Sequence, residues 1–190
     1  MSKLLSNTPY DGFSQISNGL CVKELSEFEI ASLAVAQNSE AEFNTIFKTL
    51  TGTALPEPGR WSKIKTGKIL WTGQSQYFYF SDRINDRLDD GLNEAFEGHG
   101  YVTLQSDGWA ALEVSGDRVH DVMERFIALD VRNQDIGFGA RSSAHHIGVF
   151  ILKIESDTYH LLTPRSSSKG FLEALLHVVE NVEAENTAQA

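Results

Sequence analysis

The chain has 190 residues, of which 41% are hydrophobic and 22% are charged, proportions typical of a soluble globular protein that can bury a sizeable core. Its 16 basic and 26 acidic side chains give a formal net charge of -10, which disfavours binding to nucleic acid or to an anionic membrane surface. No apolar run is long enough to predict a membrane-spanning helix.

Apolar spacing defines the elements expected in the first half of the chain. Residues 1–22 show no regular pattern, and they are predicted to form an irregular N-terminal arm. Apolar residues recur with helical spacing between Phe43 and Leu50, and Gly52 is suited to end that helix. The elements expected here are a strand at 28–36, a helix ending near Gly52, a hairpin at 68–80, a helix at 84–97 and a strand from 101.

The second half is expected to open on a tight reversal. Asp107-Gly108 tolerates the positive φ of a hairpin turn, so 101–104 and 109–116 are predicted to pair as neighbouring strands. Helical spacing follows from 119 to 127, after Gly116 and Asp117. Beyond it we expect a loop at 130–143, a hairpin at 148–163, a helix at 171–182 and a flexible tail at 183–190.

The two halves, about 28–105 and 106–182, show the same order of elements. The predicted fold is therefore α+β, with mainly antiparallel sheets, about four helices and two intertwined split β-α-β halves in a single domain spanning 23–182. The alternative is an ordinary α+β alternation without an internal duplication.

Motifs that would carry chemistry are missing from the sequence. It contains no phosphate-binding loop, no HExxH zinc motif and no GxSxG nucleophile elbow. His145 and His146 would point to opposite faces of an extended segment, which is poor geometry for one metal ion. We predict no catalytic residue and no metal site, and the sequence assigns no cofactor-binding residue.

Cys21 is the only cysteine, which excludes an intrachain disulfide and cysteine-rich metal sites. The first twenty residues lack the basic start and apolar run of a signal peptide, so a cytoplasmic location is expected. The thiol is interpreted as a small buried side chain, with a reactive thiol as the alternative.

An ordered set of segments resembles a known family. The chain carries LTGTALPEPGRW, then KILWTGQSQYFYF, then LEVSGDRVHDVMERFIALDV and finally DTYHLLTPRSSSKGFLEALL. Together they resemble the gamma subunit of heterotetrameric sarcosine oxidase over roughly residues 28–180. The matching positions are Leu55-Pro56, Leu70-Trp71-Gly73, Tyr77, Val114-Ser115-Gly116 and Leu129-Asp130. The same fold family includes the T-protein of the glycine cleavage system and is linked to tetrahydrofolate.

The resemblance implies a non-catalytic packing component of an oxidoreductase complex. Such a complex converts sarcosine to glycine and hydrogen peroxide and passes the one-carbon unit to tetrahydrofolate. The resemblance also implies that FAD, FMN, NAD, tetrahydrofolate and zinc belong to the alpha, beta and delta partner subunits, and that this chain binds no cofactor itself.

Two places in the sequence are candidates for binding a partner or an anion. Lys63, Lys65 and Lys68 form the one basic stretch without acids, and Lys63 and Lys65 would share a strand face that could meet an acidic partner subunit or the glutamate tail of a folate. Protection of an exposed strand edge is the alternative. Arg165 precedes three serines at a helix start, where it could hold a carboxylate or a phosphate, although simple helix capping also explains the pattern.

Three hypotheses follow for the role of the chain. The first is the gamma-type subunit described above. The second is a free-standing tetrahydrofolate-binding protein of the T-protein type, and the third is a structural homodimer formed by the isolated chain.

Overall fold

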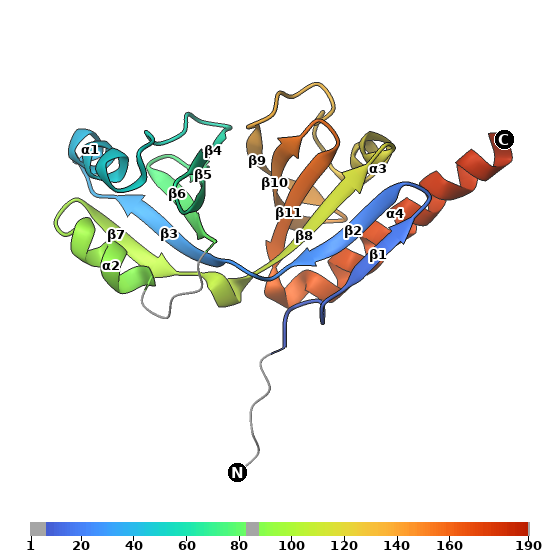
Figure 1. Ribbon diagram of the computed structural model, residues 1–190, viewed down its shortest axis with the longest axis horizontal. Helices are drawn as coiled ribbons and strands as arrows, with labels where there is room; N and C mark the ends of the chain where they lie inside the picture. The colour runs from blue at the N-terminus through green and yellow to red at the C-terminus, as the bar shows by residue number, and fades with distance from the viewer. Residues whose placement is uncertain (1–6, 83–87, 190) are drawn as a thin grey trace, which may run out of the picture. The chain divides into compact units, whose positions relative to one another are not determined.

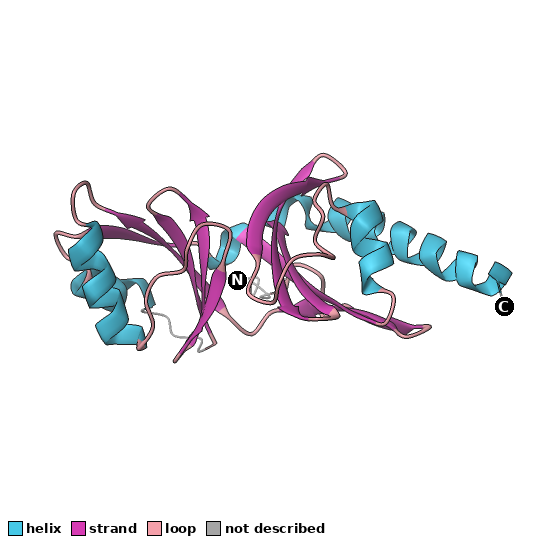
Figure 2. Cartoon of the chain, turned by 90° about the horizontal axis from the view of Figure 1, so that it is seen from above, coloured by secondary structure: helices cyan, strands magenta, loops and turns pink. Residues whose placement is uncertain are grey.

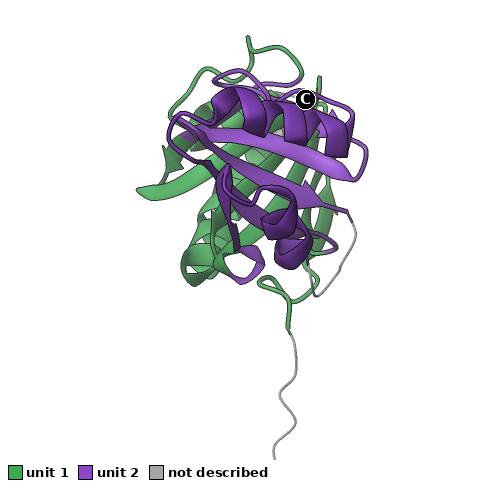
Figure 3. Ribbon diagram, turned by 90° about the vertical axis from the view of Figure 1, so that its left-hand side faces the viewer, with its two compact units in different colours: residues 1–26, 108–136, 142–190 green, residues 27–107, 137–141 purple. Residues whose placement is uncertain are grey.

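The computed structural model describes residues 7–82 and 88–189, with the side chains described as far as residue 185. The chain forms two compact units, which are distinguished by colour in Figure 3. The six-stranded unit comprises residues 1–26, 108–136 and 142–190, and the five-stranded unit comprises 27–107 and 137–141. The chain passes from the five-stranded unit to the six-stranded unit near residue 107.

The five-stranded unit is an antiparallel sheet in the order β4-β5-β6-β3-β7 (Figure 1). Helix α1 ends at Gly52, whose φ of 79° is the left-handed conformation expected of a glycine cap. The bounds are β3 Glu29–Val35, α1 Glu40–Thr51, β4 Trp61–Ile64, β5 Gly67–Gly73, β6 Gln76–Ser81, α2 Leu88–Ala95 and β7 Gly100–Leu104.

Apolar side chains from the helices and one face of this sheet form the core of the five-stranded unit. Phe43 of α1 stacks on Phe96, which follows α2, with ring centroids 4.1 Å apart. Leu33 and Ile69 are fully buried in the same cluster. The predicted apolar stripe of α1 is confirmed for its buried positions, whereas Leu50 is exposed. Ile84, predicted for the next helix, lies outside the described residues.

The six-stranded unit is an antiparallel sheet in the order β1-β2-β8-β11-β10-β9. Helices α3 and α4 cover one face of it (Figure 2), and Phe126 of α3 meets Phe171 of α4 edge to face. The bounds are β1 Ser14–Ser17, β2 Leu20–Leu25, β8 Trp109–Gly116, α3 Val119–Phe126, β9 Gly139–Ala144, β10 Ile147–Glu155, β11 Thr158–Pro164 and α4 Ser168–Gln189.

Both units repeat one topology. The run β3-α1-β4-β5-β6-α2 of the five-stranded unit corresponds to β8-α3-β9-β10-β11-α4 of the six-stranded unit, and the corresponding strands have the same order in their sheets. The position of β7 beside β3 is taken in the six-stranded unit by β2 beside β8. The chain therefore has the predicted α+β fold, with mainly antiparallel sheets and two intertwined halves.

The N-terminal arm is more regular than predicted. Residues 14–25 form the β1–β2 hairpin, and Asn18 and Gly19 in its turn have φ values of 45° and 80°. An Asn-Gly pair favours this kind of turn, so a local signal for the hairpin is present in the sequence. The backbone N–H groups of Tyr10 and Gly12 donate to the Glu24 carboxylate at 2.9 and 2.6 Å, which holds the preceding segment in place.

The hairpin predicted around Asp107-Gly108 is wrong. Strands β7 and β8 lie in different sheets, and residues 106–108 form a short 3-10 turn between them. β7 pairs with β3 instead, where Leu104 lies opposite Ala31. Just beyond, the Ile30 N–H donates to the Ser106 hydroxyl at 3.0 Å and so extends this pairing. The loop predicted at 130–143 likewise gives way to a strand, β9, at its C-terminal end.

The flexible tail predicted at 183–190 is helical as far as Gln189. Two arginines of the α3 region hold this end of α4. Arg118 donates to the Val182 carbonyl at 2.7 Å, and Arg125 pairs with Glu185 at 2.7 Å. Alanine and glutamate in the segment have high helix propensity, which supports the same extension.

Candidate functional site

An acidic, aromatic pocket of about 410 Å³ lies in the five-stranded unit. Its walls come from the start of α1, the loop before β4 and the turn between β5 and β6. Several positions that carry the family resemblance meet here, because Leu55, Pro56, Trp71 and Tyr77 all line it. The complete lining is Val35, Glu40, Asn44, Leu55, Pro56, Glu57, Pro58, Trp71, Gln74, Ser75 and Tyr77.

Side-chain hydrogen bonds fix the loop that forms one wall of this pocket. The Asn44 amide oxygen accepts the Leu55 N–H at 3.1 Å, so α1 holds the loop directly. The Thr51 hydroxyl is buried at the end of α1 and hydrogen-bonds the Thr53 backbone. Pro56 and Pro58 restrict the backbone further, because proline fixes φ. The pocket is therefore a pre-formed feature of the unit.

The electrostatics of the pocket favour a cation over an anion. Glu40 and Glu57 are both exposed and line the same cavity. Burial raises the pKa of the Tyr77 hydroxyl, and the negative charge of Glu57 raises it further. Aromatic faces such as that of Trp71 also attract cations. The same charges would repel the carboxylates of a folate tail.

The three predicted lysines lie on the β4–β5 hairpin of the five-stranded unit. Lys63 of β4 is directly opposite Lys68 of β5, and neither forms an ion pair with another described residue. The expectation that Lys63 and Lys65 share a strand face is wrong, because β4 ends at Ile64 and Lys65 lies in the turn. The structure therefore places two like charges side by side at the β4 edge of the sheet.

Arg165 lies in the one-turn 3-10 helix that precedes α4 in the six-stranded unit. Its guanidinium donates to the Asn7 carbonyl at 2.8 Å. Arg165 belongs to the six-stranded unit and the lysines belong to the five-stranded unit.

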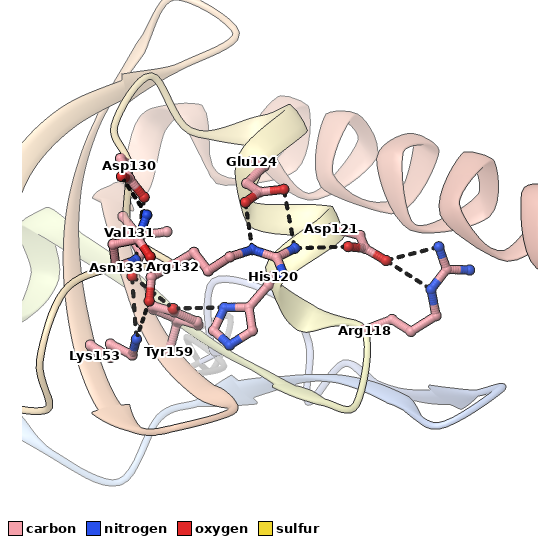
Figure 4. A network of polar contacts seen from close by, with 10 residues as sticks. All are labelled: Arg118, His120, Asp121, Glu124, Asp130, Val131, Arg132, Asn133, Lys153 and Tyr159. Carbon is pink, nitrogen blue, oxygen red and sulfur yellow. Dashed lines mark hydrogen bonds and ion pairs between the residues drawn. The ribbon is translucent and has the colours of Figure 1, made fainter.

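A buried lysine that the sequence reasoning missed organises the loop after α3. Lys153 is only 5% exposed, and its ammonium donates to the carbonyls of Arg132 at 2.9 Å and Val131 at 3.4 Å (Figure 4). It also donates to the Gln134 carbonyl at 2.8 Å. The sequence signal was a single lysine at an inward position of the apolar run GVFILKI.

Tyr159 and His120 extend the network around Lys153. The Tyr159 hydroxyl donates to the Val131 carbonyl at 3.1 Å and lies 3.1 Å from the His120 Nδ1. Burial raises the pKa of Tyr159 to about 12, so the hydroxyl stays protonated. Burial also lowers the pKa of His120, and the neighbouring Lys153 and Arg132 charges lower it further. The Tyr159 hydroxyl thus bonds both the His120 ring and a backbone carbonyl of the loop after α3, which holds that loop in place.

Ion pairs on the surface of α3 continue this network. Asp121 accepts from Arg118 at 2.8 Å and from Arg132 at 3.0 Å, and Arg132 also bonds Glu124 (Figure 4). Burial raises the pKa of Asp121, but the two arginines outweigh it and lower the pKa below its usual range.

A second ion-pair cluster crosses three strands of the six-stranded unit. Glu113 of β8 pairs with Lys23 of β2 at 2.8 Å and lies 3.2 Å from the His160 ring nitrogen of β11. Burial raises the pKa of Glu113, but the hydrogen bond and charge of Lys23, together with His160, lower it overall. The carboxylate is partnered on both sides, as in a cross-strand ion-pair ladder.

Metal ligands do not gather in the part of the chain that the structure describes. Within 7–82 and 88–189, no three histidine, cysteine, aspartate or glutamate side chains lie close enough to hold an ion. His145 and His146 occupy the tight turn between β9 and β10, with positive φ values of 45° and 66°, and not the extended segment that was expected. Among the described residues, no helix combines the length and the apolar character that a membrane crossing requires.

Comparison with known proteins defines the class of fold. No protein-family model and no curated protein sequence matches the chain. Among solved structures, a chain of the heterotetrameric sarcosine oxidase from Corynebacterium sp. U-96, solved with pyrrole 2-carboxylate, matches with a TM-score of 0.80 and 17% identity. That match covers 94% of this chain and 96% of the oxidase chain.

A second match comes from the glycine cleavage system. The aminomethyltransferase T of Bartonella henselae matches with a TM-score of 0.63 and 12% identity over 80% of this chain. This chain spans only 44% of the aminomethyltransferase. The chain therefore has a T-protein-like fold, and the matched sarcosine oxidase chain shares it over nearly its whole length.

Proposed function

We propose that the chain is a structural subunit, of the gamma type, in a cytoplasmic heterotetrameric sarcosine oxidase. The observation that carries the proposal is the structural match over 94% of this chain and 96% of the oxidase chain. The aminomethyltransferase, by contrast, is more than twice the length of the segment matched. The ordered sequence segments that resemble the gamma subunit support the same assignment.

In this proposal the chain contributes binding surface and its partners contribute the chemistry. The alpha, beta and delta subunits would carry FAD, FMN, NAD, tetrahydrofolate and zinc. The complex would convert sarcosine to glycine and hydrogen peroxide, with transfer of the one-carbon unit to tetrahydrofolate. The Lys153 ammonium and the Glu113 carboxylate are both held by internal partners, and this supports a structural role for the two clusters.

The paired lysines of the β4–β5 hairpin are the proposed partner contact in this unit. Two like charges opposite each other are unfavourable in the free chain, and an acidic partner surface would relieve that repulsion. Arg165 is a weaker candidate for such a contact, because its guanidinium already holds the Asn7 carbonyl.

The test is purification of the tagged full chain from its own cells under mild salt, followed by identification of the associated proteins. We expect flavin-containing oxidase subunits to be recovered with it. Lys63→Glu/Lys68→Glu should slow association by about tenfold at low salt, since charge at an interface rim acts mainly on the association rate. Lys169→Glu, an exposed lysine of α4, is the matched control. Recovery of the chain alone under all conditions would overturn the proposal.

A free-standing tetrahydrofolate-binding protein is the second candidate, and the fold shared with the aminomethyltransferase favours it. It predicts saturable binding of tetrahydrofolate to the purified chain in calorimetry. The acidic pocket opposes this candidate, because Glu40 and Glu57 would repel a folate tail. Saturable binding in the absence of partners would favour the second candidate over the first.

A further inference from the structure

Among the described residues, β7 lacks the outer neighbouring strand that the corresponding strand of the six-stranded unit has. In the six-stranded unit, β2 corresponds to β7, and β1 pairs with the outer edge of β2 in antiparallel fashion. In the five-stranded unit, β7 is the last strand, and no described strand pairs with its outer edge. The duplicated fold thus shows, within the same chain, how a sixth strand is added at this position.

The hydrogen bonds between β7 and β3 identify which backbone groups of β7 face outward. Gln105 donates to the Ile30 carbonyl at 2.7 Å, and Ala36 donates to the His99 carbonyl at 2.9 Å. Antiparallel pairing alternates, so the odd-numbered residues of β7 bond β3 and the even-numbered residues point away from it. The N–H and C=O groups of Val102 and Leu104 therefore face outward, without a partner among the described residues.

The side chains of β7 do not protect this edge. Natural sheets block exposed edges with lysine, proline or a bulge. The opposite edge of the same sheet, β4, carries Lys63, but β7 has the sequence GYVTL. Tyr101 is 70% exposed and Leu104 is 43% exposed. An uncharged, regular strand with exposed apolar side chains is suited to pairing with another strand.

The acidic side chains of helix α2 favour a pairing segment that carries positive charge. It packs over β7, and within Leu88–Ala95 it bears Asp89, Asp90 and Glu94 with no lysine or arginine. A second copy paired through β7 would bring the same acidic helix to the shared edge, and the like charges would repel. A segment with basic side chains would be attracted instead.

We propose that β7 accepts an extended segment of a partner polypeptide as an additional antiparallel strand, with lysine or arginine side chains of that segment facing α2. This inference goes beyond the proposed function. It concerns the edge opposite the lysine hairpin, and it does not depend on the partner being an oxidase subunit.

The test uses the full chain and two synthetic eight-residue peptides that differ only in charge. One alternates lysine with valine, which places every lysine on one face of a strand, and the other has glutamate in place of lysine. Binding is followed by NMR titration and by amide hydrogen exchange. We expect the lysine peptide to bind at least about tenfold more tightly and to slow exchange at Val102 and Leu104 by about tenfold.

Proline substitution separates edge pairing from charge attraction alone. Val102→Pro removes an outward N–H without removing a hydrogen bond to β3, and it should weaken binding of the lysine peptide by about tenfold. Val102→Ala retains the N–H and is the control. Leu104→Pro, compared with Leu104→Ala, repeats the test if Val102→Pro does not fold by circular dichroism.

Three outcomes would overturn the inference. The first is equal binding of the two peptides, and the second is binding that the proline variants leave unchanged. The third is a dimer of the chain in sedimentation that Val102→Pro dissociates, because a second copy would then occupy β7. None of these results bears on co-purification with oxidase subunits, so the two proposals fail separately.

Discussion

Replacement of the buried Lys153 by methionine tests the hydrogen-bond network that holds the loop after α3 in the six-stranded unit. Methionine keeps much of the apolar stem but removes the ammonium that bonds the Arg132 and Gln134 carbonyls at 2.9 and 2.8 Å. Hydrogen bonds to a charged group contribute about 1.5–3 kcal/mol each, or about 3–6 kcal/mol for two. Relief of the ammonium's desolvation offsets part of that loss.

The net loss expected for Lys153→Met is therefore about 3 kcal/mol in the free energy of unfolding. For a chain of this size, a loss of that magnitude lowers the melting temperature by about 6–12 °C. Urea unfolding followed by circular dichroism measures the free energy directly. Lys169→Met, at an exposed position of α4, should change it by less than about 0.5 kcal/mol. A loss at Lys153 no larger than at Lys169 would refute the network.

Three further predictions concern pH, a strained turn and a close backbone approach. The pKa of His120 is lowered in the folded state, so the free energy of unfolding should fall as the pH drops below about 6.5. His120→Gln should reduce that fall, which urea titrations at several pH values would measure. Replacing His145 and His146 by Asn and Gly should raise the free energy of unfolding by about 1 kcal/mol, since both have positive φ. Gly116→Ala would place a Cβ against the Gly19 carbonyl in the β1–β2 turn, and it should lower the free energy of unfolding by about 3 kcal/mol or more. Gly91→Ala, the control, has open space around the new Cβ and should raise the free energy of unfolding by about 0.5–1 kcal/mol. Thermal unfolding measures both changes.

Local patterns were sufficient to predict the helices and two of the hairpins, β5–β6 and β10–β11, whereas the β1–β2 hairpin was missed. The buried stripe of α3 follows from the spacing of Val119, Val122, Met123 and Phe126, all of which are buried. The β10–β11 hairpin follows from two apolar runs separated by a short polar turn. These elements depend on contacts between residues that are near in sequence, and such contacts produce a regular spacing of apolar residues that can be recognised.

Pairing between distant strands left no comparable signal. Asp107-Gly108 is compatible with a hairpin turn, but β7 pairs with β3, about seventy residues earlier, and β8 with β2 and β11. Which strands pair depends on which apolar faces can be buried together, and a local dipeptide does not encode this.

Only some of the residues that line the acidic pocket could be singled out from the sequence. Pro56, Trp71 and Tyr77 were noted for their resemblance to a family, but Glu40 and Glu57 had no pattern that linked them to these residues. The fold brings them together around one cavity. The buried Lys153 was overlooked for a related reason, since its partners are backbone carbonyls of a loop about twenty residues away.

The most direct test of the central claim is the intact mass of the assembly that contains this chain. The tagged chain is purified from its own cells and measured by native mass spectrometry. The account predicts a complex of one copy of this chain with three different partner subunits, including flavin-carrying ones. A mass equal to the chain alone, or to two copies of it, would contradict the account.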